Sequence, residues 1–164
     1  MKKITYLIIS IIFLNFINAC AGYKPIYKTN LQFEIADYSI KANKKLGRQI
    51  YSKLYNLSKS NKNNTEIQSI TIIIAATKNK NATVKDSAGK VLEYRIVLTS
   101  NIIIKDYLTD DAILNQTFSY SSTYKVQDQY SETIKLENKS IENLLNKIYK
   151  NLLIKMSESI LTKW

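Results

Sequence analysis

The sequence predicts an α+β fold, a two-layer α/β sandwich in which two helices pack on one face of a four-stranded, mostly antiparallel sheet. Apolar residues recur with the two-residue period of strands in four segments, and with helical spacing in two others. The segments follow one another in the order β-α-β-β-β-α. One-faced strands and one-striped helices bury their apolar surfaces most economically when the two layers face each other.

The first two predicted elements are a strand over residues 31–38 and the helix that follows it. Leu31, Phe33 and Ile35 alternate with Gln32 and Glu34, which is typical of a half-buried strand. The helix is predicted with Asn43 as its N-cap and with a polar loop over residues 58–64 after it. Gly47 costs about 1 kcal/mol of helix propensity relative to alanine, so the helix depends on packing its apolar stripe. That stripe is Leu46, Ile50, Leu54 and Leu57.

Three further strands are predicted over residues 66–78, 91–106 and 113–126. Turns over residues 85–90 and 108–112 join them, so the three strands form an antiparallel meander with one apolar face. The residues expected on that face are Ile70, Ile72, Ile74, Leu92, Tyr94, Ile96, Leu98, Ile102, Ile104, Leu114, Phe118, Tyr120, Tyr124 and Val126.

A long amphipathic helix is predicted at the end of the chain, with Ser140 as its N-cap. Its apolar residues follow helical spacing, whereas Lys147, Lys150 and Lys155 fall off the stripe. The stripe is Ile141, Leu144, Leu145, Ile148, Leu152, Met156 and Ile160.

The composition favours a binding protein with an anionic partner over an enzyme. The formal net charge is +11, although the abundance of lysine in the whole sequence is an alternative explanation of that total. The chain has no histidine, the commonest general base, and its single cysteine excludes an internal disulfide and a multi-cysteine zinc site. The carboxylate pair Asp110 and Asp111 is interpreted as turn chemistry. We therefore expect no catalytic residues, metal or cofactor.

The N-terminus resembles a bacterial lipoprotein signal. Two lysines precede an apolar run over residues 4–17, which is shorter than the ~20 residues that a membrane span needs. The following Ile17-Asn18-Ala19-Cys20 resembles a lipobox, with Asn18 in place of the usual small residue. The resemblance implies a signal peptide over residues 1–19 and lipidation of Cys20. Pro25 disfavours a helix, so residues 20–30 are expected to form an extended tether. The length of the remaining chain predicts one domain over 31–164. The alternative is an uncleaved membrane anchor that retains Cys20.

The order of motifs over nearly the whole mature chain resembles the LptE family, the lipopolysaccharide-assembly lipoproteins of the Gram-negative outer membrane. The motifs are "CAGYKPIY", then "ATVKDSAGKVLEYRIVLTSNIIIKD", then "FSYSSTYKV", then the long terminal helix. The resemblance implies a plug in the lumen of the LptD-type β-barrel, which helps that barrel to fold and binds lipopolysaccharide. By resemblance to lipoprotein sorting in Gram-negative bacteria, Ala21 after the cysteine favours anchoring to the outer membrane, on its periplasmic side.

The same resemblance implies candidate lipopolysaccharide-binding residues. The family's basic residue in the turn between its second and third strands matches Lys85, with Lys90 across the turn. A second family lysine precedes the last helix, and Lys135 is the nearest match. The bland alternative for each is a solvated lysine. The partners expected are therefore an LptD-like barrel, lipopolysaccharide and a membrane reached through the lipid anchor, with no nucleic acid.

Two other functions remain open at this point. One is a periplasm-facing outer-membrane lipoprotein with a structural or envelope-interaction role and no barrel partner. The other is a lipid-anchored enzyme, which the absence of histidine and of any nucleophile–base pair disfavours.

Overall fold

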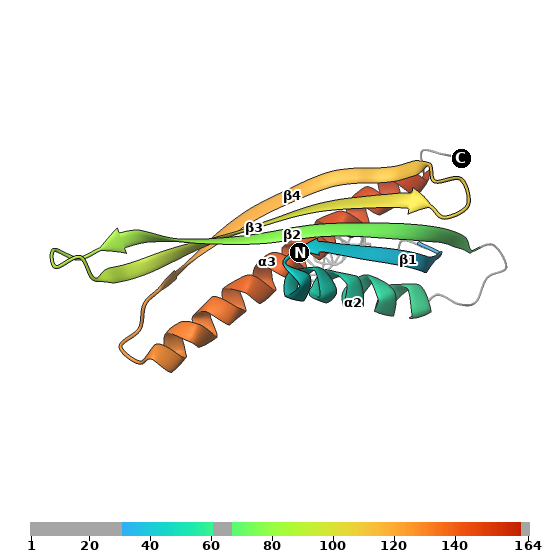
Figure 1. Cartoon of the computed structure of the whole chain (residues 1–164). Helices are drawn as coiled ribbons and strands as arrows, with labels where there is room; N and C mark the ends of the chain where they lie inside the picture. The colour runs from blue at the N-terminus through green and yellow to red at the C-terminus, as the bar shows by residue number, and fades with distance from the viewer. Residues whose placement is uncertain (1–30, 61–66, 162–164) are drawn as a thin grey trace, which may run out of the picture.

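One sheet and two helices form two layers, as the sequence predicts (Figure 1). The structure is a computed structural model that describes residues 31–60 and 67–161. The predicted signal peptide, Cys20 and the tether lie outside the described residues. The elements are β1 (Phe33–Ala42), α2 (Lys44–Ser60), β2 (Gln68–Lys85), β3 (Val91–Asp106), β4 (Ala112–Lys125) and α3 (Tyr130–Leu161).

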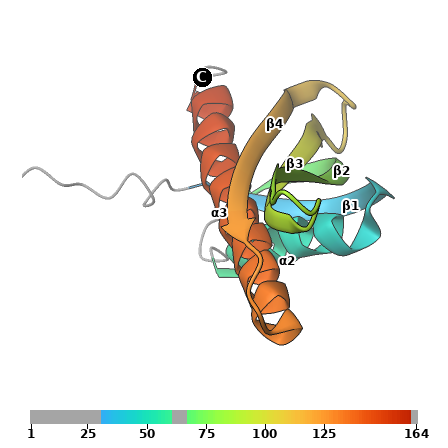
Figure 2. The same cartoon turned by 90° about the vertical axis from the view of Figure 1, so that its left-hand side faces the viewer.

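The sheet has the strand order β1-β2-β3-β4. Strand β1 runs parallel to β2, and the other two pairings are antiparallel, so the mostly antiparallel sheet is confirmed. A parallel neighbour requires a crossover connection, and α2 is part of the connection between β1 and β2. Figure 2 shows α2 and α3 on the same side of the sheet.

The core lies between the sheet and the helices. The register Ile72↔Ile104 and Ile74↔Ile102 aligns the isoleucines of β2 and β3, and all four are almost completely buried. The buried members of both predicted stripes belong to this core, and Ile50, Leu54, Ile148 and Leu152 are the most buried of them. Leu92 is the exception on the predicted apolar face, because it lies near the end of the hairpin and is 41% exposed.

Strand β1 differs in detail from its prediction. It begins at Phe33 and continues to Ala42, past the predicted end at residue 38. A register shift between Ile35 and Asp37 interrupts the alternation, which explains why the second half of the strand did not match the pattern. Asn43 caps α2 as predicted, because its Oδ1 accepts a hydrogen bond from the Leu46 backbone N–H at 3.1 Å.

Helix α3 begins eleven residues before residue 141, the first helical residue predicted after the N-cap Ser140. The structure places its first residue at Tyr130, so the assignment of Ser140 as N-cap is wrong. The additional turns bury Thr133, Glu137 and Ser140 on the side facing the protein. The buried face of the helix therefore continues toward the N-terminus. Its residues there are polar, so a search for apolar residues at helical spacing does not detect them.

Strands β2 and β3 extend beyond the core as a hairpin arm, which we define as residues 77–95. Strand β2 reaches Lys85 rather than ending at residue 78, and every residue from Thr77 to Lys90 is exposed. The turn itself spans residues 86–90, with Lys85 as the last residue of the strand. Figure 1 shows the arm projecting past the body of the protein, on the side where the first turns of α3 lie.

Replacing Gly47 by alanine tests the close approach of α2 to β1. A Cβ atom at this buried helical position would overlap Cγ2 of Ile40. This methyl carbon is bonded directly to Cβ of Ile40, close to the backbone of β1, so it has little freedom to move away. Alanine normally favours a helix over glycine by about 1 kcal/mol. Here we expect Gly47→Ala to lower the free energy of unfolding by about 1–3 kcal/mol, the cost of overpacking. Urea denaturation measures this change.

The double variant Gly47→Ala with Ile40→Ala provides the control, because Ile40→Ala removes the overlapping methyl group. We expect Gly47→Ala not to lower the free energy of unfolding when it is introduced into the Ile40→Ala protein. A single Gly47→Ala variant as stable as the parent would contradict the packing described.

Candidate functional site

The tip of the arm presents two of the candidate lysines around one tight turn. The Asp86 side chain builds this turn, because its Oδ1 accepts hydrogen bonds at 2.9 Å from the backbone N–H groups of Ala88 and Lys90. Gly89 adopts a φ of 82°, a conformation that favours glycine. Lys85 and Lys90 flank the turn, and both are exposed.

The arm as a whole is cationic. Residues 77–95 contain five basic side chains against the two carboxylates Asp86 and Glu93. The basic side chains are Lys78, Lys80, Lys85, Lys90 and Arg95. A projecting segment with this excess of ammonium and guanidinium groups attracts anions, and phosphate above all.

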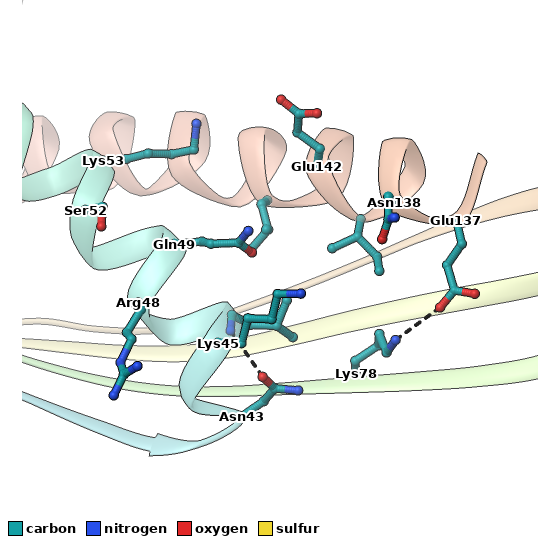
Figure 3. Close-up of a pocket in the computed structure, with 13 residues that line it drawn as sticks. Asn43, Lys45, Arg48, Gln49, Ser52, Lys53, Lys78, Glu137, Asn138 and Glu142 are labelled. Carbon is teal, nitrogen blue, oxygen red and sulfur yellow. Dashed lines mark hydrogen bonds and ion pairs between the residues drawn. The ribbon is translucent and has the colours of Figure 1, made fainter. Parts of the chain in front are cut away.

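At the base of the arm, Glu137 of α3 receives hydrogen bonds from three side chains. Lys78 Nζ lies 3.1 Å from its Oε1, and Lys80 Nζ lies 2.6 Å from its Oε2. The Tyr124 hydroxyl donates to the same Oε2 at 2.9 Å. The Glu137 side chain is only 11% exposed, so this charge is largely removed from water and its partners compensate it. We call these four residues the arm clamp (Figure 3 shows the Lys78–Glu137 contact).

Aromatic rings complete the arm clamp. Lys80 Nζ lies 4.3 Å from the centroid of the Tyr94 ring, and the Tyr94 and Tyr124 rings stack with centroids 5.9 Å apart. A cation above an aromatic face gains electrostatic energy from the ring, in addition to its ion pair. Strands β2, β3 and β4 and helix α3 therefore meet at this one point.

The electrostatics of the arm clamp keep its ion pairs charged. Burial works to raise the pKa of Glu137, but the hydrogen bonds from Lys80, Tyr124 and Lys78 outweigh it and lower the pKa from 4.5 to about 2. Burial likewise works to lower the pKa of Lys80, and its hydrogen bonds with Glu137 and Tyr124 raise that pKa above the ordinary value. The carboxylate and the ammonium are both ionised at neutral pH.

The third candidate lysine lies in a different environment. Lys135 does not precede the last helix, because the helix already begins at Tyr130. It is an exposed residue of α3, two positions before Glu137. The structure thus brings Lys85 and Lys90 together at one turn and leaves Lys135 on a separate element.

The predicted turn chemistry of the Asp110–Asp111 pair is confirmed. Lys105 Nζ contacts both carboxylate oxygens of Asp110, at 2.9 and 2.8 Å, and Asp110 has a φ of 59°. Asp111 accepts a hydrogen bond from the Thr109 hydroxyl at 2.9 Å. Both carboxylates therefore serve the turn between β3 and β4.

The described residues hold neither a cluster of metal ligands nor a membrane-spanning helix. No group of three or more His, Cys, Asp or Glu side chains among them is placed to hold a metal ion. None of the helices in the described ranges is long and apolar enough to cross a membrane.

Replacing Glu137 by glutamine tests the arm clamp through its pH dependence. Because the pKa of Glu137 is lowered on folding, its ionised form stabilises the fold above pH 4.5, and this contribution is lost as the pH falls from 4.5 to about 2. At pH 7 we expect Glu137→Gln to lower the free energy of unfolding by about 1–3 kcal/mol. The difference from the parent protein should shrink toward pH 2 in urea denaturation.

The control is Glu158→Gln, which removes an exposed i,i+3 ion pair with Lys155 on the same helix. That change should alter the free energy of unfolding by at most about 0.5 kcal/mol at either pH. If the parent and Glu137→Gln proteins differ equally at pH 7 and pH 2, the arm clamp does not hold an ionised carboxylate.

Comparisons with known proteins identify the fold through structure alone. No protein-family model and no curated protein matches the sequence. Rare lipoprotein B from Shewanella oneidensis has a similar structure, with a TM-score of 0.54 and 12% identity over 77% of this chain and 97% of that one.

Two further lipoproteins are similar to a comparable degree. Lipoprotein B from Nitrosomonas europaea is 17% identical, with a TM-score of 0.54 over 87% of this chain and 93% of that one. A minor lipoprotein from Acinetobacter baumannii is 14% identical, with a TM-score of 0.51 over 77% of this chain and 93% of that one. The chain therefore has the fold of these lipoprotein structures.

Proposed function

We propose that this protein is an outer-membrane lipoprotein that plugs an LptD-type β-barrel, assists its assembly and binds lipopolysaccharide on its way to the outer leaflet. In this proposal Cys20 carries the lipid anchor, and the folded domain acts on the periplasmic side and in the barrel lumen. The protein works by binding and has no catalytic activity. The observation that carries the proposal is a projecting cationic arm on a fold shared with lipoprotein structures.

The fold supports the proposal in its general form. The neighbouring structures are rare lipoprotein B and related lipoproteins, and their arrangement is the LptE-like lipoprotein fold. The same arrangement here accompanies a sequence in which a positive start and an apolar run precede Ile17-Asn18-Ala19-Cys20. Lipid chains on one terminal residue supply a stable anchor, because each buried CH₂ contributes about 0.8 kcal/mol.

The arm supports the lipopolysaccharide part of the proposal. Lys85 and Lys90 are exposed on a turn that projects from the body of the protein (Figure 1). Lipopolysaccharide carries phosphate groups, and lysine ammonium groups form short, charge-assisted hydrogen bonds with phosphate. The arm clamp holds the base of this projection through the two ion pairs of Glu137.

The uncovered face of the sheet supports the barrel part of the proposal. Hydroxyl and amide side chains form a hydrogen-bonded network across β3 and β4 on this face. Thr99 and Ser119 are joined at 3.0 Å, and Asn101 Nδ2 donates to Thr117 Oγ1 at 3.0 Å. A polar, uncharged surface of this kind suits the polar interior of a large barrel.

Affinity purification from outer membranes tests the barrel partnership. The full chain carries a C-terminal tag and is solubilised in mild detergent from a strain that expresses it. We expect an LptD-like barrel to co-purify, and mass spectrometry identifies it. Recovery of the tagged lipoprotein without any large barrel would contradict the proposal and favour a structural envelope lipoprotein.

Charge reversal at the tip of the arm tests lipopolysaccharide binding. Lys85→Glu replaces an ammonium group by a carboxylate beside the expected phosphate, so we expect the dissociation constant for lipopolysaccharide to rise about ten-fold or more. Barrel co-purification should be unchanged. The matched control is Lys44→Glu on the exposed first residue of α2, which should leave the affinity within about two-fold, as for an exposed charge remote from the site.

The same binding measurement on Lys90→Glu and Lys135→Glu assigns the other two candidates. A residue whose reversal leaves the affinity at the Lys44→Glu value does not belong to the site. If Lys85→Glu itself gives that value, the arm tip is not the lipopolysaccharide contact.

A further inference from the structure

A cleft of about 700 Å³ lies between α2 and α3, with Lys78 and Glu137 of the arm clamp among its lining residues (Figure 3). Its volume lies within the range of pockets that bind small molecules or parts of larger ones. Neither the apolar stripes nor the lysine motif of the arm predicts it, because its walls come from two helices far apart in the sequence. The lining residues are Asn43, Lys45, Leu46, Arg48, Gln49, Ser52, Lys53, Lys78, Glu137, Asn138, Ile141, Glu142 and Leu145.

The charges that line this cleft favour an anion. Of its two carboxylates, Glu137 is already engaged by Lys78 and Lys80. Figure 3 shows the other, Glu142, pointing away from the space between the helices. Lys45 and Lys53 line the cleft from α2, and neither forms a salt bridge with a carboxylate in the described part of the chain. Lys53 Nζ lies 5.9 Å from the centroid of the Tyr149 ring, a contact that leaves its positive charge unneutralised. Two uncompensated ammonium groups in one concave site attract a negative group more strongly than the same groups on a convex surface.

The remaining lining residues indicate what carries the anion. Leu46 and Leu145 are 5% and 3% exposed and form an apolar floor together with the half-buried Ile141. Side-chain amides and a hydroxyl surround this floor, and such groups hydrogen-bond to the hydroxyls of a sugar. They are Asn43, Gln49, Ser52 and Asn138. None of the 13 lining residues is aromatic, so the cleft offers no ring on which a nucleobase could stack.

We propose that the cleft between α2 and α3 is a second anion site, separate from the arm tip, that binds the phosphorylated sugar headgroup of a glycolipid. Lys45 and Lys53 contact the phosphate, the amides contact the sugar, and the apolar floor accepts the first part of an acyl chain. The choice of glycolipid rests on the proposed function, in which lipopolysaccharide is the ligand. The arm and the cleft then hold different parts of one large amphiphile, or two molecules in succession.

Binding of lipid A to the full chain in detergent tests this site. The key comparison is Lys45→Glu against Lys44→Glu, because these neighbours undergo the same change of charge in the same helical turn and only Lys45 lines the cleft. We expect Lys45→Glu to raise the dissociation constant for bisphosphorylated lipid A at least five-fold, and Lys44→Glu to leave it within two-fold. Lys53→Glu provides an independent second variant, with the same expected loss. Circular dichroism and the urea midpoint verify that each variant is folded.

Two further probes identify the chemistry. Chemically dephosphorylated lipid A should bind more weakly to the parent protein and should no longer distinguish Lys45→Glu from Lys44→Glu. Inorganic phosphate should compete poorly, because it contacts neither the amides nor the apolar floor. Effective competition by inorganic phosphate would overturn the glycolipid assignment in favour of a simple anion site.

The outcomes separate this inference from the proposed function. Equal affinities of Lys45→Glu and Lys44→Glu overturn the cleft site and leave the barrel partnership and the arm tip standing. Failure of the parent protein to bind lipid A at all overturns the cleft site together with the lipopolysaccharide part of the proposed function. Barrel co-purification is a separate experiment that does not measure lipid A binding. Its failure would contradict the barrel partnership alone and would not bear on the cleft site.

Discussion

The inner face of β2 changes from apolar to cationic between Ala76 and Lys78, and the arrangement of α3 depends on that change. Because side chains alternate along a strand, Lys78 and Lys80 lie on the same face as Ile72 and Ile74. A helix that covers this face must therefore present leucine and isoleucine to one part of it and a carboxylate to the other. Glu137 meets the second requirement, with both lysines in hydrogen-bond contact.

Helix α3 consequently has two halves with different roles. Its C-terminal half buries Ile148, Leu152 and Met156 in the core, and supplies much of the apolar surface there. Its N-terminal half buries Thr133, Glu137 and Ser140, and holds the base of the arm. An uncompensated charge at Glu137 would be costly at 11% exposure, so the position of α3 along the sheet is tied to the two lysines. Core packing and charge pairing thus specify the same placement of the helix.

The sequence predicts the features that depend on local periodicity and misses those that depend on distant pairs. Ile70, Ile72 and Ile74 repeat at two residues and Leu46, Ile50 and Leu54 at helical spacing, so the order of elements, the core face and the cap at Asn43 follow from pattern alone. The order of the strands in the sheet, with β1 beside β2, comes from the structure. The arm clamp joins Glu137 to lysines 57 and 59 residues away, and no local period reports such a pairing. The cleft is missed for the same reason. The start of α3 is hidden because polar residues occupy its buried stripe there.

The separation of the arm from the core has a consequence for how such a protein can change over generations. Residues from Asn81 to Lys90 lie beyond the arm clamp and bury almost nothing, so most substitutions there remove little packing energy and leave the unfolding equilibrium close to its starting value. Substitutions of the paired core isoleucines of β2 and β3 are costly, because these side chains are fully buried and a smaller residue would leave a cavity. The residues are Ile72, Ile74, Ile102 and Ile104. Selection can therefore alter the chemistry of the arm tip without a compensating change in the scaffold. Under the proposed function, one scaffold can then serve envelopes whose surface glycolipids differ in the number and position of their charges.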